Sequence, residues 1–324
     1  MEPAQTLKRR ALPLLLALTA NAAAQSFLFV VMPPLGRRLG FSDLQTGALL
    51  GLPAFLLLIA APVWGSLSES YGRRPVLTVA LAGAAVGTLA VGALIALRLA
   101  GQITMSSTLA LLFAARIGQA LLAGGLLPAA QAMMADLSAR ERRAEAMGLL
   151  GAAYGIGAVA GGASAFAFGG TAPAGGLVGI GIVLLLCLAA FRLRMPEPAG
   201  NGTRAVRAIP RIKTARAIWP NAVATFLAVA AYGLMQQVTA LRLQDAFGFS
   251  PQLATTRAGA FLMAAAICMT VAQAFGPRML GLTPKRLMQI GGAIALVAMA
   301  LVAMAPAWPL LAAGVVLLGP ALGL

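Results

Sequence analysis

The chain has 324 residues, of which 60% are hydrophobic and 10% are charged, with a formal net charge of +16. A soluble domain carries about 25% charged residues, because water must wet its surface. The composition therefore excludes a soluble enzyme, a soluble binding module and a disordered tail. The sequence contains no histidine, which also excludes histidine-based catalysis and histidine-ligated metals.

Charge-free blocks of about 20 residues are long enough to cross about 30 Å of hydrocarbon as helices. These blocks are 11–36, 44–68, 75–97, 99–135 (with the single charge Arg116), 146–191, 217–241, 258–277 and 287–324. Glycine and proline clusters at 169–176 and 305–309 divide the fifth and the last block. The sequence thus predicts an all-α integral membrane fold with ten spans. The tenth span, from about Leu310, is too short to cross, so we expect a transporter truncated inside this helix.

The basic residues are distributed unequally between the two sides of the membrane. Of the 24, 18 fall in loops on the side of the N-terminus and five in loops on the other side. The positive-inside rule then places the N-terminus in the cytoplasm. The excess of basic residues is therefore explained by membrane topology, and no nucleic-acid partner is expected. A cleavable signal peptide ending near Ala20-Asn21-Ala22 is the alternative for the first segment. The uncharged stretch continues to Gly36, which favours a retained helix.

The order of spans predicts two bundles. Residues 1–192 form a six-helix bundle, 193–216 a basic cytoplasmic linker, and 217–324 an incomplete second bundle. Many secondary transporters consist of two such bundles, with the substrate site near the bilayer midplane between them.

The loop between the second and third spans carries the most specific motif. Gly65, Leu67, Gly72, Arg73, Arg74 and Leu77 fit the pattern Gly-x-Leu-x-Asp-x-x-Gly-Arg-Arg/Lys-x-x-Leu, and Glu69 stands in place of the aspartate. In this motif, and in its place in the chain, the sequence resembles the major facilitator superfamily. The resemblance implies a two-bundle architecture, of which about ten of twelve helices are present.

The resemblance also implies a conformational latch built from this loop. The family's loop arginine, here Arg73, pairs with an acid at the end of the fourth span, here Asp136. The loop acid, here Glu69, faces the start of an eleventh helix, which lies beyond Leu324. The alternative is that Arg73 and Arg74 only anchor the topology of the loop.

Arg116 and Gln119 in the fourth span match another motif of the family, Arg-x-x-Gln-Gly, in which Ala120 replaces the glycine. Arg116 is expected near midplane, where a charge costs about 2.5–3.5 kcal/mol on insertion scales. It should therefore face the bundle interior, where it binds an anionic substrate or influences a coupled proton. The alternative is a structural role as a hydrogen-bond donor to helix carbonyls.

The fifth span contains Gly151, Gly155, Gly157 and Gly161, and small residues at this spacing let helices pack closely. The family's antiporters carry a Gly-Pro pair and a later Gly-Gly pair in this span. Here Gly162 occupies the proline position and Ala165-Phe166 the second pair, so the antiporter signature is only partial.

Polar side chains within spans are candidates to line the cavity. They are Asn21, Gln25, Gln119, Gln131, Tyr154, Tyr232 and Gln236. Polar residues in spans also serve as hydrogen-bond donors between helices, which is the alternative. All eight acids lie in loops or at helix ends, so no intramembrane carboxylate is predicted to carry a proton. Cys187 and Cys268 lie in apolar runs and are expected to be buried, with no metal and no cofactor bound.

Together these features predict a monomeric secondary transporter in a bacterial-type inner membrane, and no enzyme activity. It would move a small molecule by alternating access, as an exporter of a drug or metabolite, with a proton as one option for the driving ion. Import of a small anionic metabolite is the alternative, favoured by Arg116. A membrane enzyme or a non-transporting receptor is a remote alternative.

Overall fold

The computed structural model describes residues 4–195 and 212–324, and these residues form helices and no strand. The first group comprises α1 (Ala4–Leu39), α2 (Asp43–Tyr71), α3 (Arg73–Leu99), α4 (Met105–Ala123), α5 (Leu126–Asp136), the 3-10 helix η1 (Arg140–Arg142), α6 (Arg143–Ser164), the π-helical turn η2 (Ala165–Gly169) and α7 (Pro173–Arg194). The second comprises α8 (Ile212–Asp245), α9 (Pro251–Leu280), α10 (Pro284–Met304) and α11 (Trp308–Gly323). The predicted all-α membrane fold is confirmed.

Within the described residues, nine helical segments are long and apolar enough to span a membrane, and α11 is a shorter apolar helix. The predicted turns are present, since α7 begins at Pro173 and the α10–α11 turn lies between Met304 and Trp308. Most of the predicted linker 193–216 falls at 196–211, outside the described residues.

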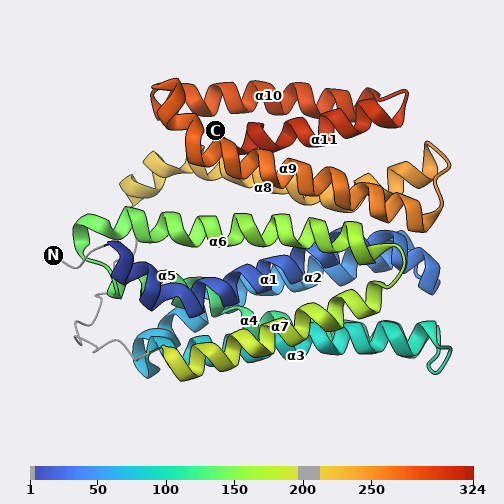
Figure 1. The fold of residues 1–324 in the computed structure, drawn as a ribbon, viewed down its shortest axis with the longest axis horizontal. Helices are drawn as coiled ribbons and strands as arrows, with labels where there is room; N and C mark the ends of the chain where they lie inside the picture. Colours follow the sequence, from blue (N-terminus) through green and yellow to red (C-terminus); the bar gives the residue numbers. More distant parts are fainter. Residues whose placement is uncertain (1–3, 196–211) are drawn as a thin grey trace.

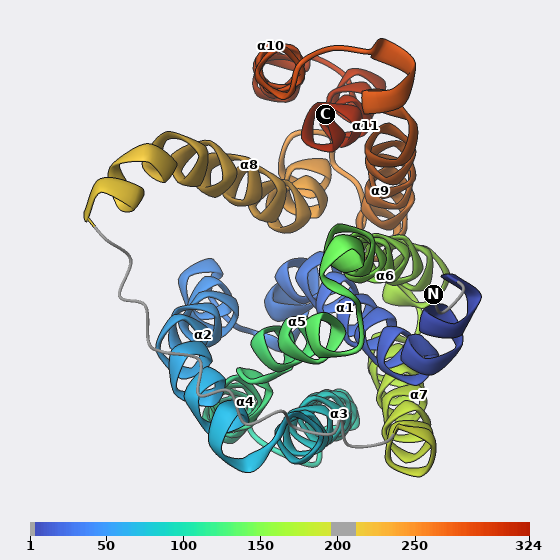
Figure 2. The same cartoon turned by 90° about the vertical axis from the view of Figure 1, so that its left-hand side faces the viewer.

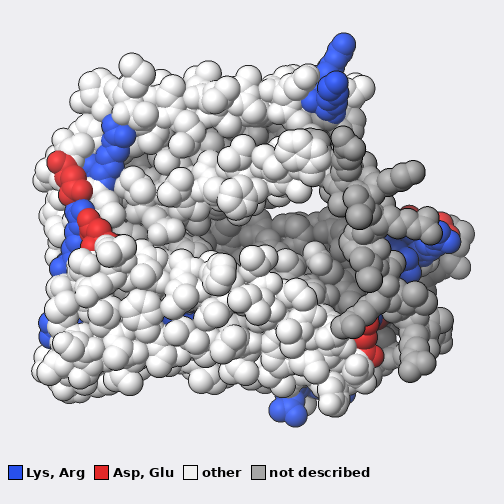
Figure 3. Space-filling model, turned by 180° about the vertical axis from the view of Figure 1, so that it is seen from behind, with Lys and Arg blue, Asp and Glu red and all other residues white. Residues whose placement is uncertain are grey.

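The helices lie roughly parallel and pack in two groups (Figures 1 and 2). In the first group, α1 packs against α6 and α7, and α3 packs against α4 and α7. In the second, α9 packs against α8 and α11, and α10 packs against α11. The groups meet where α6 packs along α9 and α1 packs against α8. Figure 3 shows most of the charged side chains near the two ends, a broad and almost uncharged band between them, and a hollow between the groups.

Two short connections define the ends of the molecule. The Arg37 end is where α1 and α8 finish and α2 begins, and there Ser42 caps α2 with a capping box that includes Gln45. The Arg73 end is where α2 meets α3 through Gly72, whose φ of 96° favours glycine.

The buried apolar side chains form two main clusters that differ in what they join. The cluster toward the Arg37 end combines Phe27 and Leu112 of the first group with Leu243, Phe261 and Leu311 of the second. The cluster toward the Arg73 end contains residues of the first group only, among them Leu14, Leu77, Met133 and Phe191. The two groups therefore share a hydrophobic core toward one end of the molecule.

The fourth predicted span is one membrane-spanning segment, Met105–Asp136, whose helix is interrupted. Residue 99 belongs to α3, α4 begins at Met105, and the helix is broken at Gly124 and Gly125 before α5. Pro128 has no N–H to donate and its ring crowds the carbonyl of Gly124, which explains the break. The indole of Trp64 donates to the Leu121 carbonyl at 2.6 Å beside it.

Candidate transport site

Arg116 lies deep in the first group of helices. It follows the first residue of α4 by eleven positions, a rise of about 16 Å, which is close to half of a 30 Å hydrocarbon layer. The residue is 4% exposed, and its guanidinium donates to Gln119 Oε1 at 2.5 Å and to Gln25 Oε1 at 3.5 Å. The prediction that Arg116 faces the bundle interior is confirmed.

Gln119 connects Arg116 to α3. Its amide nitrogen donates to the Ala84 carbonyl and to Thr88 Oγ1, each at 3.1 Å. Gly87 permits this close approach, since a methyl group at that position would lie 2.6 Å from Gln119 Cβ. The Gln119 amide group is thus fixed by α3, and its oxygen is aimed at the guanidinium.

The charge of Arg116 is solvated by amides rather than neutralised by a carboxylate. Both recorded partners are glutamine oxygens, and its buried Nε atom has no hydrogen-bond partner. A buried cation without full compensation is costly in an apolar interior. The arrangement can therefore accept an anionic group.

The six acids among the described residues lie at helix ends or in loops, as expected. They are Asp43, Glu69, Asp136, Glu141, Glu145 and Asp245.

A second polar contact lies where the two groups of helices meet. Gln236 of α8 is 5% exposed and donates to Ser26 Oγ at 3.2 Å, and the Ser26 hydroxyl donates to the Ala158 carbonyl of α6 at 3.3 Å. Because Ser26 follows Gln25, α1 carries the Arg116 contact and the Gln236 contact on adjacent residues.

The remaining cavity candidates are less closely associated with this cluster. Asn21, Tyr154 and Tyr232 are half-buried, on α1, α6 and α8. Gln131 is exposed on α5, on the far side of the helix break from Arg116. The structure thus brings Gln25, Gln119 and Arg116 together directly.

At the Arg73 end, the ion pair implied by the family resemblance is present. Arg73 Nε lies 3.2 Å from Asp136 Oδ2, and Arg73 Nη1 donates to Ser68 Oγ at 3.0 Å. Arg74 donates to the Arg192 carbonyl at 2.6 Å, which ties the start of α3 to the end of α7.

Two other residues of this motif are less constrained. Glu69 is exposed in the last turn of α2. Gly65 faces open space, because an added methyl group would meet no atom within 4 Å.

The glycines of α6 let it pack closely against helices of both groups. A methyl group on Gly157 would lie 2.5 Å from Ala22 Cβ on α1, and one on Gly161 would lie 2.6 Å from the Ala23 carbonyl oxygen. On the opposite face, a methyl group on Gly155 would approach Thr270 Oγ1 of α9 to 3.0 Å.

Gly151 was expected to join this packing, and that expectation is wrong. Gly151 is exposed and nothing lies within 4 Å of an added methyl group, because it lies on the outer face of α6, whereas the adjacent Leu150 is 4% exposed and packs in the core.

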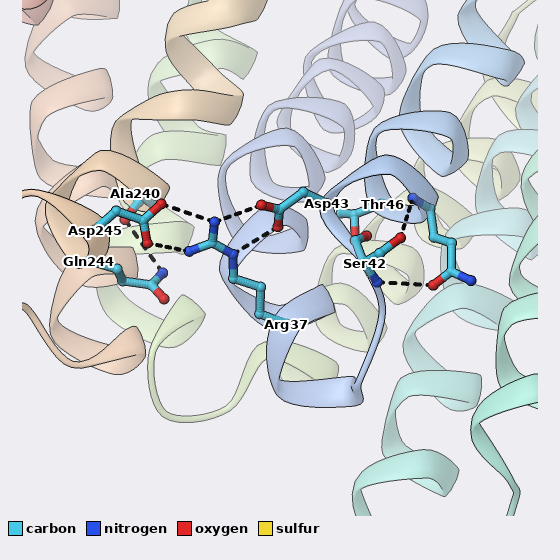
Figure 4. A network of polar contacts seen from close by, with 8 residues as sticks. Arg37, Ser42, Asp43, Thr46, Ala240, Gln244 and Asp245 are labelled. Carbon is cyan, nitrogen blue, oxygen red and sulfur yellow. Dashed lines mark hydrogen bonds and ion pairs between the residues drawn. The ribbon is translucent and has the colours of Figure 1, made fainter.

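The structure contains a cluster of ion pairs at the Arg37 end that was not predicted from the sequence (Figure 4). The Arg37 guanidinium of α1 contacts Asp43 of α2 at 2.7 and 2.8 Å and Asp245 of α8 at 2.6 and 3.0 Å. The three side chains are only partly buried: Arg37 is 29% exposed, Asp43 56% and Asp245 60%. We refer to these three residues as the clamp; it joins the two groups of helices across the Arg37 end.

Comparison with known proteins agrees with this architecture. The family model of the Major Facilitator Superfamily matches residues 14–324, almost the whole chain. The chain belongs to the major facilitator superfamily. The predicted resemblance to this superfamily is confirmed.

Curated relatives match over part of the chain. Human solute carrier family 67 member A1 is 36% identical over 133 residues, covering 41% of this chain and 29% of that protein. The class G tetracycline resistance protein of Vibrio anguillarum is 34% identical over 152 residues, covering 45% of this chain and 35% of that protein. These alignments thus span about a third of each relative's length.

Solved structures share the fold along the entire chain. An inward-facing, occupied bacterial homologue of the human lysosomal transporter Spinster has a TM-score of 0.69 and 21% identity, covering 100% of this chain and 74% of that one. The human organic anion transporter MFSD10 has a TM-score of 0.66 and 18% identity, covering 99% and 84%. At these identities the likeness concerns the fold.

Proposed function

We propose that this major facilitator chain is a secondary transporter that exports a small drug-like molecule or metabolite by alternating access. The bundle of residues 1–192 would rock against the bundle of residues 217–324 around a midplane site, with 193–216 as the linker. Similarity to tetracycline resistance proteins supports the exporter branch, and the two groups of helices supply the two rocking bodies.

The single observation that carries the mechanism is that α8 packs against the first group of helices only toward the Arg37 end. Toward this end the two groups share a hydrophobic core and the clamp. The second half of α8 takes part in this contact, with Met235 and Leu243 6% and 0% exposed. In its first half, Phe226 and Leu227 are 71% and 60% exposed. This geometry fits one end state of an alternating-access cycle, closed at the Arg37 end.

In our proposal, the orientation of the protein in the membrane is inferred from its basic loops. The Arg73 end carries the larger share of lysine and arginine in the sequence and would face the cytoplasm, with the N-terminus on the same side. The closed Arg37 end would then face outward from a bacterial-type inner membrane, and the conformation described here would be the one that is open to the cytoplasm. An exporter loads its substrate in this state.

The substrate site of this proposal is centred on Arg116 and Gln25, next to the Ser26–Gln236 contact between the groups. The cluster combines a buried positive charge, amide groups and a contact that must break when the groups separate. Asn21, Tyr154 and Tyr232 complete the set of residues proposed to face substrate. The positive charge of Arg116 would influence a coupled proton that is carried by another group.

Import of a small anionic metabolite is the second candidate, and the unneutralised Arg116 favours it. Everted vesicles and proteoliposomes separate the two directions. An exporter accumulates tetracycline or a lipophilic cation in everted vesicles, and Arg116→Ala abolishes this. If right-side-out vesicles take up carboxylates, and neither tetracycline nor the lipophilic cation is exported, the proposal of an exporter is wrong and the protein is an importer.

A further inference from the structure

A large apolar hollow opens on the membrane-facing side of the first group of helices, away from the Arg116 cluster. Its volume is about 680 Å³, in the range of small-molecule sites. We call it the α1–α7 groove. Its walls come from α1, α6 and α7 and include Leu16, Ala23, Ser164, Gly175, Gly179 and Cys187.

The groove is open to the bilayer along its length. Three of its residues, Leu16, Phe168 and Val183, are 50%, 51% and 49% exposed, although they are large and apolar. Cys187, which was expected to be buried, is a half-buried free thiol on the wall. The hydroxyl of Thr19 is already engaged with the Ala153 carbonyl at 3.1 Å. The walls thus suit hydrocarbon.

The shape of the groove fits one extended chain. Along α7 it runs from Gly175 to Cys187, a rise of about 18 Å, which exceeds half of a 30 Å hydrocarbon layer. Gly175 lies in the first turn of α7, so the groove begins at the Arg37 end of the bilayer and descends past its middle. An added methyl group on Gly179 would meet no atom within 4 Å, so the space beside it is unfilled by the protein.

The mouth of the groove carries a positive charge. Arg38, in the last turn of α1, is exposed, and its guanidinium reaches the carbonyl of Gly170 at 3.5 Å, a long contact. Gly170 is two residues from Ala172, which lines the groove, and the exposed Thr171 lies between them. An arginine at the mouth of the groove can bind the phosphate of a lipid headgroup through charge-assisted hydrogen bonds.

From the hollow and its charged mouth we infer a binding site for a membrane phospholipid of the leaflet at the Arg37 end. Its phosphate contacts Arg38, and one acyl chain lies in the α1–α7 groove as far as Cys187. The lipid supports the face of α1 that lies opposite the contact with α8, and its binding is independent of the direction of transport.

Native mass spectrometry of the purified full chain tests this site. The protein is transferred from phosphatidylglycerol nanodiscs into a mild detergent, and the retained phosphatidylglycerol is counted and titrated back. The wild-type chain is expected to retain one molecule through washing. Gly179→Phe fills the groove and should abolish retention, while Gly51→Phe, which places the same side chain in open space on α2, should not.

The charged mouth is tested by a second pair of variants. Arg38→Gln should weaken phosphatidylglycerol binding about tenfold, the scale of one hydrogen bond to a charged group. Arg140→Gln, which removes one charge at the other end, should leave binding unchanged. If Gly179→Phe fails to fold, Val183→Trp obstructs the same groove.

Equal retention by the wild-type chain and either groove-filling variant, once folded, would overturn the site. Displacement of the lipid by tetracycline, with tetracycline protecting Cys187 from a lipophilic maleimide, would overturn it as well, since the groove would then hold substrate. A loss of transport alone does not bear on this inference, because the measurement counts lipid.

Discussion

Removing Arg37 is the sharpest test of the clamp. Arg37→Ala deletes both ion pairs and leaves Asp43 and Asp245, two like charges, facing each other across the Arg37 end. If the clamp stabilises closure at this end, the variant shifts the conformational equilibrium toward the state that is open there. Arg37→Lys should shift it less, because lysine retains the charge but lacks the planar fork that engages two carboxylates.

The size of the shift follows from the geometry. Exposed ion pairs contribute about 0.2–1 kcal/mol each, and Arg37 makes two with paired hydrogen bonds of 2.6–3.0 Å. The clamp should therefore contribute about 0.4–2 kcal/mol, a change of roughly 2- to 30-fold in the ratio of the two states. High salt should reduce the effect, because these side chains are partly exposed.

Thiol reactivity behind the clamp measures the shift. Gln237 lines a small pocket of about 110 Å³ together with Asp43 and Thr46, directly inside the clamp. Gln237→Cys, made in a Cys187→Ala, Cys268→Ala background, is labelled with a membrane-impermeant maleimide added from the Arg37 side. Arg37→Ala should raise the labelling rate 2- to 30-fold at low salt. An unchanged rate, in protein that remains folded, would refute the role of the clamp in closure.

Three further predictions concern the transport site, the motif at the Arg73 end and helix packing. Arg116→Ala should lower transport in proteoliposomes at least tenfold and Arg116→Lys less, because a point charge suffices to bind an anion or to influence a coupled proton; equal losses would assign Arg116 a structural role. Arg73→Ala should abolish transport while the chain still inserts and folds, and normal transport rates would contradict the latch. Gly157→Leu should lower the thermal unfolding midpoint through overpacking of about 1–3 kcal/mol, whereas Gly151→Leu, in open space, should not; similar midpoints would contradict the packing described here.

The spans and the burial of Arg116 could be predicted because both follow from one dominant force. Hydrocarbon excludes charge, so long uncharged runs become helices and a single arginine within one turns inward. The Arg73–Asp136 pair was predictable for another reason, since a family motif specifies both residues. The break at Gly124 also had a local signal, because Pro128 follows a glycine pair.

Features that depend on register and on distant pairing could not be read from the sequence. Gly151 and Gly157 lie in the same helix, and only the packing of α6 distinguishes the exposed residue from the tightly packed one. Arg37 and Asp245 are separated by 208 positions, and each resembles an ordinary loop charge. The groove beside Gly179 arises from space between three helices, which no local pattern encodes.

Alternating access itself is tested most directly by distances at the two ends of the molecule. Spin labels at Leu44 and Ala246 report the Arg37 end, and labels at Tyr71 and Trp219 report the Arg73 end; all four residues are exposed. Double electron–electron resonance in nanodiscs, with and without Arg37→Ala, should show the first distance lengthening as the second shortens. Two distances that stay fixed, or that lengthen together, would contradict a rocking motion of the two groups of helices.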